Sequence, residues 1–271
     1  PDDRLYIVDW TARIQAFDRD GKHLGVTFST PDYRNGRPSG LSVIEDGEWK
    51  GHLVVSDSHY HCVRVYTPKG ELVKTIGGQA GTAPGQLSYI SDALFDAAGN
   101  LYVAEFGDNQ RISKFDKDGT FVKCWGMPGG AREIDDSLQA APVGEFARIR
   151  AMTLGPDGNL YVADACNHRI QVFTTDGAFV RAFGTPGEGA GELSYPYDVA
   201  CSKGSPPYLY VVEWQNCRVQ KFTLEGESLG VWGAPGRGPG QLSSPWALAV
   251  DSQNRVHVVD SLNDRVQRID F

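Results

Sequence analysis

The stretch from Leu160 to Phe173, with the sequence L-Y-V-A-D-A-C-N-H-R-I-Q-V-F, decides the fold. It contains an apolar run that ends in Asp164 and a short polar break with Asn167 and Arg169. A second run follows, in which apolar and polar residues alternate. Two runs of strand-forming residues around a tight polar break are typical of a β-hairpin.

This hairpin recurs five more times along the chain. The other first runs begin at Leu5, Leu53, Leu101, Leu209 and Val256. The acidic residues that end the six first runs are 48, 48, 59, 49 and 47 residues apart: Asp9, Asp57, Glu105, Asp164, Glu213 and Asp260. An arginine opens the second run in every copy except the second, which has Cys62 there: Arg13, Arg111, Arg169, Arg218 and Arg265. A near-constant step of this kind indicates a repeat architecture.

Each complete copy is expected to contribute four strands. Turns with glycine, at 97–100, 117–120, 156–159 and 175–178, separate the runs, because glycine and asparagine tolerate the positive φ of tight turns. Six such copies predict an all-β fold, a six-bladed β-propeller with four-stranded antiparallel blades, as a single domain over residues 1–271. The first copy lacks its innermost strand and the last its outermost. We therefore expect incomplete first and last blades. Either the ring tolerates two three-stranded blades, or the chain is part of a longer protein, and we favour the second.

The repeats resemble NHL repeats. The copy at 245–269, P-W-A-L-A-V-D-S-Q-N-R-V-H-V-V-D-S-L-N-D-R-V-Q-R-I, follows the NHL pattern of an apolar strand, a turn, a strand that ends in Asp, an Asn-x-Arg break and a further strand. Closing W-G or F-G pairs stand at 125–126, 183–184 and 232–233. The resemblance covers essentially the whole chain and implies a six-bladed NHL propeller. Such propellers host RNA binders, protein-interaction modules, sensor domains and enzymes, so the resemblance implies a fold and not a function.

Charge and composition restrict the partners. The net charge of −8 and the lack of a basic run argue against nucleic acid, which is bound through clustered Lys and Arg. No apolar run has the length of a membrane helix, so we expect a soluble, non-inserted protein that is monomeric or part of a longer chain. The start at Pro1 allows a removed leader, and an extracytoplasmic or secreted location is our expectation. Five cysteines without a close pair fit neither a disulfide framework nor a zinc site, although Cys166 and Cys217 occupy equivalent breaks.

The starts of the innermost strands form the first candidate site, a ligand-binding surface at the mouth of the central channel. Its residues are Asp92, Arg150, Tyr197, Asp198 and Trp246. The two aspartates stand where the repeat prefers glycine, and an unpaired buried carboxylate is costly. They either bind a polar or cationic ligand, with Ca²⁺ as the one cofactor they suit, or cap neighbouring N–H groups. We expect no other cofactor.

A second candidate is a partner-binding face formed by the polar breaks and the long connections between copies. Its residues are Trp10, His59, Phe106 and Trp214, and the alternative is that the aromatic rings pack between blades. His59, His61 and Cys62 lie close in sequence, but three ligands from one short loop rarely give tetrahedral geometry, so we predict no metal site. The insertion at 131–141 is expected to form one or two helical turns.

The sequence favours a binding scaffold for a protein, a peptide or a small polar ligand on the long-loop face. The alternative is a metal-dependent hydrolase or lyase centred on Asp92, Arg150, Tyr197 and Asp198. Peptidyl-hydroxyglycine lyases, which are six-bladed relatives, hold zinc with histidines at the inner-strand starts. The matching residues here include no histidine: Ser39, Ser91, Arg150, Tyr197 and Trp246.

Overall fold

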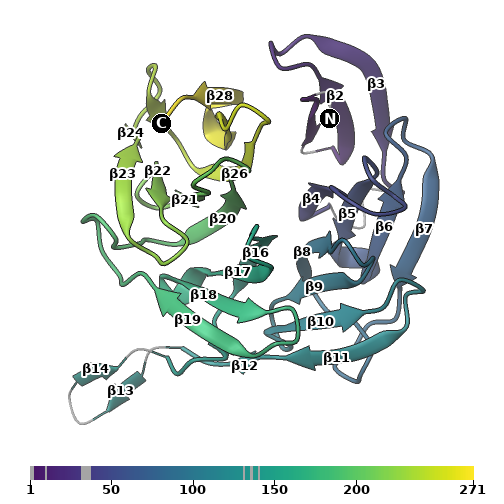
Figure 1. Ribbon diagram of the computed structural model, residues 1–271, viewed down its shortest axis with the longest axis horizontal. Coiled ribbons are helices and arrows are strands. Elements are labelled where there is room, and N and C mark those ends of the chain that lie inside the picture. Colours follow the sequence, from purple (N-terminus) through teal and green to yellow (C-terminus); the bar gives the residue numbers. More distant parts are fainter. Residues whose placement is uncertain (1–2, 10, 32–37, 131, 135–136, 140) are drawn as a thin grey trace. The chain divides into compact units, whose positions relative to one another are not determined.

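Six antiparallel sheets follow one another along the chain in the computed structural model (Figure 1). The structure describes residues 3–9, 11–31, 38–130, 132–134, 137–139 and 141–271. This arrangement confirms the predicted all-β, six-bladed propeller fold. Helical structure in these ranges is limited to the short 3-10 turns Ser58–Tyr60, Ala165–Asn167 and Ser261–Asn263, and none of it is long and apolar enough to span a bilayer. The chain divides into two compact units, Pro1–Trp125 and Gly126–Phe271.

The first unit contains three sheets whose strands lie in chain order. The first sheet has three strands, β1 (Leu5–Val8), β2 (Arg13–Phe17) and β3 (His23–Ser29). The second has β4 (Gly40–Val43), β5 (Leu53–Asp57), β6 (Cys62–Tyr66) and β7 (Leu72–Gly77). The third has β8 (Ile90–Phe95), β9 (Leu101–Glu105), β10 (Arg111–Phe115) and β11 (Phe121–Trp125). The leading strands of neighbouring sheets contact each other, as β4 and β8 do.

The second unit repeats this plan. Its sheets are β16 (Ile149–Leu154), β17 (Asn159–Asp164), β18 (Arg169–Thr174) and β19 (Phe179–Phe183); β20 (Pro196–Cys201), β21 (Leu209–Glu213), β22 (Arg218–Phe222) and β23 (Ser228–Trp232); and β26 (Pro245–Val250), β27 (Val256–Asp260) and β28 (Arg265–Ile269). Two short parallel pairs brace the connections: β12 (Met127–Pro128) with β15 (Glu145–Phe146), and β24 (Ala234–Pro235) with β25 (Gln241–Leu242). Strand β20 contacts both β16 and β26, so the leading strands of this unit lie side by side.

The insertion between the third and fourth copies is not helical, which corrects the expectation for 131–141. Its described backbone forms a hairpin, β13 (Arg132–Ile134) with β14 (Ser137–Gln139), which extends away from the rest of its unit in Figure 1. The acidic composition suggested a surface helix, but cross-strand pairing satisfies the backbone hydrogen-bonding groups of so short a segment equally well.

The leading strands begin earlier than their apolar runs predict. Strand β8 starts at Ile90 and not at Ala93, and β20 starts at Pro196 and not at Val199. In β8, β16, β20 and β26 the register shifts near the start, which is the signature of a β-bulge. The bulge breaks the two-residue alternation, so the hydrophobic pattern identifies only the part of the strand beyond it.

Burial explains why the first runs of the hairpins are continuously apolar. All five residues of β5, β9 and β21 are buried, because neighbouring strands flank them and sheets cover their faces. The outermost strands β11, β19 and β23 have several exposed residues each. The core therefore consists of the first three strands of the blades, together with leucines from the connections such as Leu87 and Leu193.

In the third to sixth copies a polar cluster around a buried acid ties the hairpin break to the connection that precedes the blade. In the fourth copy the Arg169 guanidinium donates to Asp164 at 2.9 Å and to the carbonyls of Ala141, Pro142 and Glu145 at 2.5–2.9 Å. Asp164 also accepts the Ala147 N–H at 2.8 Å. The arginine thus spans the hairpin and the connection, as the recurrence of the acid–arginine column predicts.

The same contacts recur in the other copies. Arg111, Arg218 and Arg265 pair with their acids and with carbonyls of their own connections. In the second copy, where Cys62 replaces the arginine, Arg64 donates to Asp57 at 2.9 Å from two residues further along. Gln171 and Gln220 occupy this later position in the fourth and fifth copies, and they also contact their acids. The exception at Cys62 is therefore a shift of the partner and not a loss of the pair.

Replacing Arg169 by alanine is expected to cost about 3–5 kcal/mol of unfolding free energy, because the fully buried Asp164 loses its charged partner. Arg13→Ala is the matched control. Its side chain is 53% exposed, so the same substitution is expected to cost about 0–1 kcal/mol. Urea denaturation followed by circular dichroism measures both values, and equal losses would contradict the assignment of a structural role to burial of the pair.

Candidate functional site

An arginine and several aromatic side chains gather where the leading strands of the second unit begin. The Arg150 guanidinium carbon lies 4.4 Å from the ring centroid of Tyr197 and 5.9 Å from that of Trp246. The Tyr197 and Trp246 rings lie 6.1 Å apart. These residues come from β16, β20 and β26, so the contacts between neighbouring strands place them together. We call Arg150, Tyr195, Tyr197, Trp214 and Trp246 the aromatic–arginine cluster.

The polar break of the fifth copy supports this cluster from behind. Trp214 stacks on Tyr197 with centroids 5.7 Å apart and an interplanar angle of 20°, and it also contacts the Tyr195 ring. Its indole N–H donates to the Ser244 hydroxyl at 2.7 Å. Tyr197 is buried and Trp214 half-buried, whereas Trp246 is 44% exposed. The buried and half-buried rings of the cluster thus support the exposed ring of Trp246 and the guanidinium of Arg150.

The backbone immediately before four of the leading strands is held in an uncommon conformation. Tyr89, Arg148, Tyr195 and Ser244 directly precede the first residues of β8, β16, β20 and β26, and their φ angles lie between 47° and 64°. Bulky residues rarely adopt this left-handed region, and such geometry persists only where neighbours enforce it. The Tyr195 carbonyl accepts the backbone N–H of Trp214 at 3.0 Å, and this bond holds the strained Tyr195 in place.

His168 secures the edge of the cluster. Its Nδ1 accepts the backbone N–H of Tyr195 at 3.3 Å, and the two rings meet edge to face at 4.7 Å. Burial lowers the pKa of His168 below its usual value, so the ring is neutral at pH 7. A neutral imidazole is what the acceptor role at Nδ1 requires.

The two aspartates of the predicted channel-mouth site serve the backbone in this structure. Asp198 accepts the N–H of Val199 at 2.8 Å and, from the next sheet, that of Leu248 at 2.9 Å. Asp92 belongs to the first unit and accepts the Ala93 N–H at 2.8 Å. A Cβ atom on Gly40 would lie 2.8 Å from the Asp92 carboxylate, which explains why the facing position in β4 is glycine. These bonds support the capping alternative for both carboxylates.

The structure separates the residues predicted for the partner-binding face. Trp10 lies outside the described residues. His59 is exposed, whereas Phe106 is half-buried against Tyr89 with ring centroids 5.5 Å apart. Only Trp214 joins the aromatic–arginine cluster. No group of three or more metal-binding side chains converges within the described residues, and the five cysteines are free thiols.

Comparison with known proteins now adds to the geometry. The NHL repeat family model matches residues 146–173, the same stretch that organises the repeats. The chain is a six-bladed β-propeller that contains an NHL repeat. Human NHL repeat-containing protein 3 is 29% identical over 171 residues, which are 60% of this chain and 46% of that protein. Peptidyl-glycine alpha-amidating monooxygenase A of Xenopus laevis is 31% identical over 150 residues, 53% of this chain and 15% of that protein. The NHL propeller thus spans less than half of either relative.

Solved structures share the propeller's fold at low sequence identity. Virginiamycin B lyase from Staphylococcus aureus has a TM-score of 0.58 at 19% identity, over 86% of this chain and 66% of that one. Hydrazine synthase from Kuenenia stuttgartiensis has a TM-score of 0.64 at 13% identity, over 99% and 92% of the two chains. Both are similar in fold alone.

Some site residues of this NHL propeller were not predicted from its sequence. Tyr195 and Ser244 join the cluster through the left-handed backbone before the leading strands, which has no signal in composition or alternation. His168 does have a signal, because it lies in the same polar break as Asn167 and Arg169. His61 stands at the equivalent position in the second copy, and the contact of His168 with Tyr195 could not be inferred from the sequence.

The propeller's stability is expected to fall as the pH decreases from 7 to 5.5, in part through His168. The folded-state pKa of His168 is lowered, so the folded protein binds fewer protons there than the unfolded chain, and acid favours unfolding. His168→Asn keeps a residue that tolerates the left-handed φ of 53° and retains an acceptor. Its unfolding free energy, measured in urea at several pH values, should decrease less over this interval. An identical pH dependence in both proteins would contradict the role of a neutral His168.

Proposed function

We propose that this NHL propeller is a binding scaffold for a protein or peptide segment, contacted through the aromatic–arginine cluster. The observation that carries the proposal is Trp246, a large ring that is 44% exposed beside the half-buried guanidinium of Arg150. Tryptophan, tyrosine and arginine are the residues that dominate binding energy at protein interfaces.

The cluster is suited to binding because its side chains are ordered before any ligand arrives. Arg150 is held over the Tyr197 ring at 4.4 Å, and Tyr197 is held by Trp214. A guanidinium stacked on an aromatic face is a group that recognises carboxylates and carbonyls through its N–H donors. Prior ordering reduces the entropy lost on binding, so a small surface can contribute substantial affinity.

The proposed ligand is an extended segment with an apolar or aromatic side chain for Trp246 and an acidic or carbonyl group for Arg150. The separation of these two groups, 5.9 Å from guanidinium carbon to ring centroid, matches neighbouring groups of one peptide. One relative, the Xenopus laevis monooxygenase, is named for action on peptidyl-glycine, which supports a peptide as the ligand class. A small polar ligand with the same two groups would use the same contacts.

The enzymatic alternative assigns catalysis to Asp92, Arg150, Tyr197 and Asp198. The hydrogen bonds from Val199 and Leu248 to Asp198 support a structural role for this carboxylate instead. A substrate screen distinguishes the two functions. Any turnover that Asp198→Asn and Asp92→Asn abolish, in proteins that remain folded, would favour the enzyme.

Replacing Trp246 by alanine is expected to weaken peptide binding by about 30-fold, which corresponds to the ~2 kcal/mol of an interface hot spot. Peptides are first selected from a random display library on the wild-type protein, and their dissociation constants are then measured by fluorescence polarisation. Arg150→Lys, which keeps the charge but loses the planar stacking group, should weaken acidic peptides by several-fold.

Leu229→Ala is the control, because Leu229 is similarly exposed at 46% but lies on the outermost strand β23. It should leave the affinities unchanged. Selected peptides that bind Trp246→Ala as tightly as the wild type, or that lose affinity in Leu229→Ala, would place the binding surface elsewhere.

A further inference from the structure

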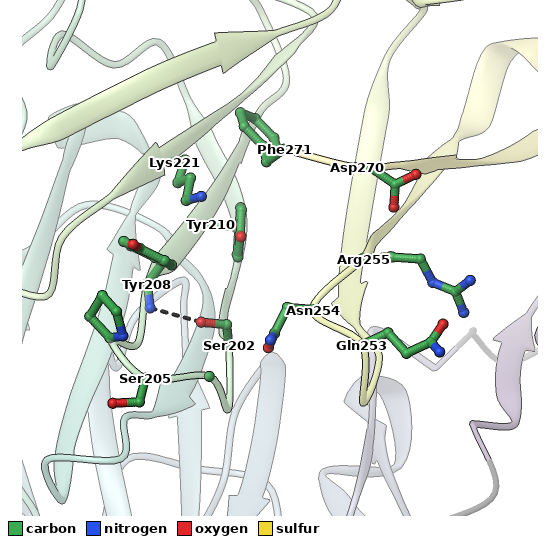
Figure 2. Close-up of a pocket in the computed structure, with 12 residues that line it drawn as sticks. Ser202, Ser205, Tyr208, Tyr210, Lys221, Gln253, Asn254, Arg255, Asp270 and Phe271 are labelled. Atoms are coloured by element: carbon green, nitrogen blue, oxygen red, sulfur yellow. Dashed lines mark hydrogen bonds between the residues drawn. The ribbon is translucent and has the colours of Figure 1, made fainter.

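A separate cavity lies at the other end of the same sheets, away from the aromatic–arginine cluster. It has a volume of about 340 Å³ and is lined by the β20–β21 turn, by the β26–β27 turn and by the side chains of Tyr208, Tyr210 and Lys221 (Figure 2). The cluster occupies the start of β20 at Tyr197, whereas the cavity follows its end at Cys201. The proposed peptide-binding function does not use this cavity.

The cavity exists where the fifth copy departs from the others. In the third and fourth copies the tyrosine of the first run donates its hydroxyl to a turn aspartate, from Tyr102 to Asp96 and from Tyr161 to Asp157, at 2.9 Å in both cases. In the fifth copy the turn is two residues longer, and Ser202 stands in place of Asp96. Ser202 retains the capping role, because its hydroxyl accepts the Tyr208 N–H at 2.8 Å (Figure 2). The turn is therefore kept, but its negative charge is lost.

The loss of the carboxylate leaves a lysine surrounded by aromatic rings. The Lys221 amino nitrogen lies 4.1 Å from the Tyr208 centroid, 5.9 Å from that of Tyr210 and 6.0 Å from that of Phe271 (Figure 2). Within the described residues no carboxylate lies within ion-pair distance of Lys221. Its given contacts are with ring faces, and the side chain is also partly open to solvent.

The other charged groups near the cavity are accounted for. Arg255 pairs with Asp251 at 2.7 Å, and His257 also donates to this carboxylate. Burial alone raises the pKa of Asp251, but the hydrogen bonds from His257 and Arg255 outweigh it and bring the pKa to about 2, so Asp251 stays ionised. Asp270 lines the outer part of the cavity and is exposed. Lys221 is thus the cation without a counter-charge, and the hydroxyls of Tyr208, Tyr210 and Ser205 add donors beside it.

We propose that this cavity binds a small aromatic anion, whose carboxylate or phosphate contacts Lys221 and whose ring lies against Tyr208, Tyr210 and Phe271. A buried or half-buried ammonium gains most from an ionised acceptor, and charge-assisted bonds are the strongest of the available contacts. The ring faces favour a planar body over an aliphatic one. A cavity of this volume is at the lower end of those that bind small molecules.

The test is isothermal titration calorimetry of the intact protein with phenyl phosphate, benzoate and inorganic phosphate at constant ionic strength. Benzyltrimethylammonium, with the same ring and the opposite charge, is the ligand control. We expect phenyl phosphate and benzoate to bind, inorganic phosphate to bind more weakly and the cation not to bind. Lys221→Ala should weaken the binding of the anions by at least about tenfold, which is the loss expected for one charged hydrogen bond. Lys221→Arg should retain most of the affinity.

Two further variants separate the site from a general effect of charge or folding. Ser202→Asp restores the carboxylate of the third copy with its turn cap, so the protein should fold and lose anion binding by at least about tenfold. Lys114→Ala removes the lysine at the equivalent position, which lies over Tyr102 beside Asp96, and should leave binding unchanged. Failure of all three anions to bind, preference for the cation, or wild-type affinity in both Ser202→Asp and Lys221→Ala would overturn the proposal.

Discussion

The second to sixth blades each depend on one buried acid that must be satisfied by hydrogen-bond donors. Asp164 is fully buried and receives hydrogen bonds from Arg169, Asn167, Gln171 and the backbone of Ala147. An unsatisfied charge at such a place would cost more than the blade gains from any single apolar contact. The arginine also donates to carbonyls of the preceding connection. The side chain that satisfies the acid therefore also determines the path of that connection. The end of the blades at which the aromatic–arginine cluster lies follows from this requirement.

Both proposed sites lie where a copy differs from the others but keeps its acid–arginine pair. At the starts of β16, β20 and β26, the residues within the bulges differ between copies, and there the second unit carries Arg150, Tyr197 and Trp246. In the β20–β21 turn, Ser202 keeps the cap that Asp96 provides in the third copy but not its charge. In both places the strand pairing of the repeat is preserved, while the side chains differ and, in the fifth copy, the turn is also two residues longer. Recurring contacts maintain the fold, and both proposals rest on the exceptions.

Most of the fold could be predicted from the sequence. The second strand of each blade is buried, so it appears in the sequence as a continuous apolar run that recurs at a near-constant interval. The site could be predicted only in part. Arg150, Tyr197 and Trp246 were found from their place at the start of each leading strand, but Tyr195 required knowledge of a left-handed backbone that no residue pattern reveals. The role of Arg64 was missed because its position two residues after Cys62 matters only once the strand register is known. The cavity was missed because a longer turn and a serine look unremarkable until the equivalent tyrosines and their acceptors are compared in space.

The position of strand β20 has a consequence for how this protein can change. The strand has six residues, Pro196–Cys201. One proposed site lies at its start and the other follows its end, about 20 Å apart at the usual rise of a strand. Sites at this separation with no shared side chain respond to substitution independently. The β20–β21 turn joins two strands whose register is the same as that of β8 and β9 in the third copy. The turn can therefore be exchanged with that of another blade without a change in strand pairing. Such an exchange alters the surface at one end of the sheet and leaves the surface at the other end unchanged.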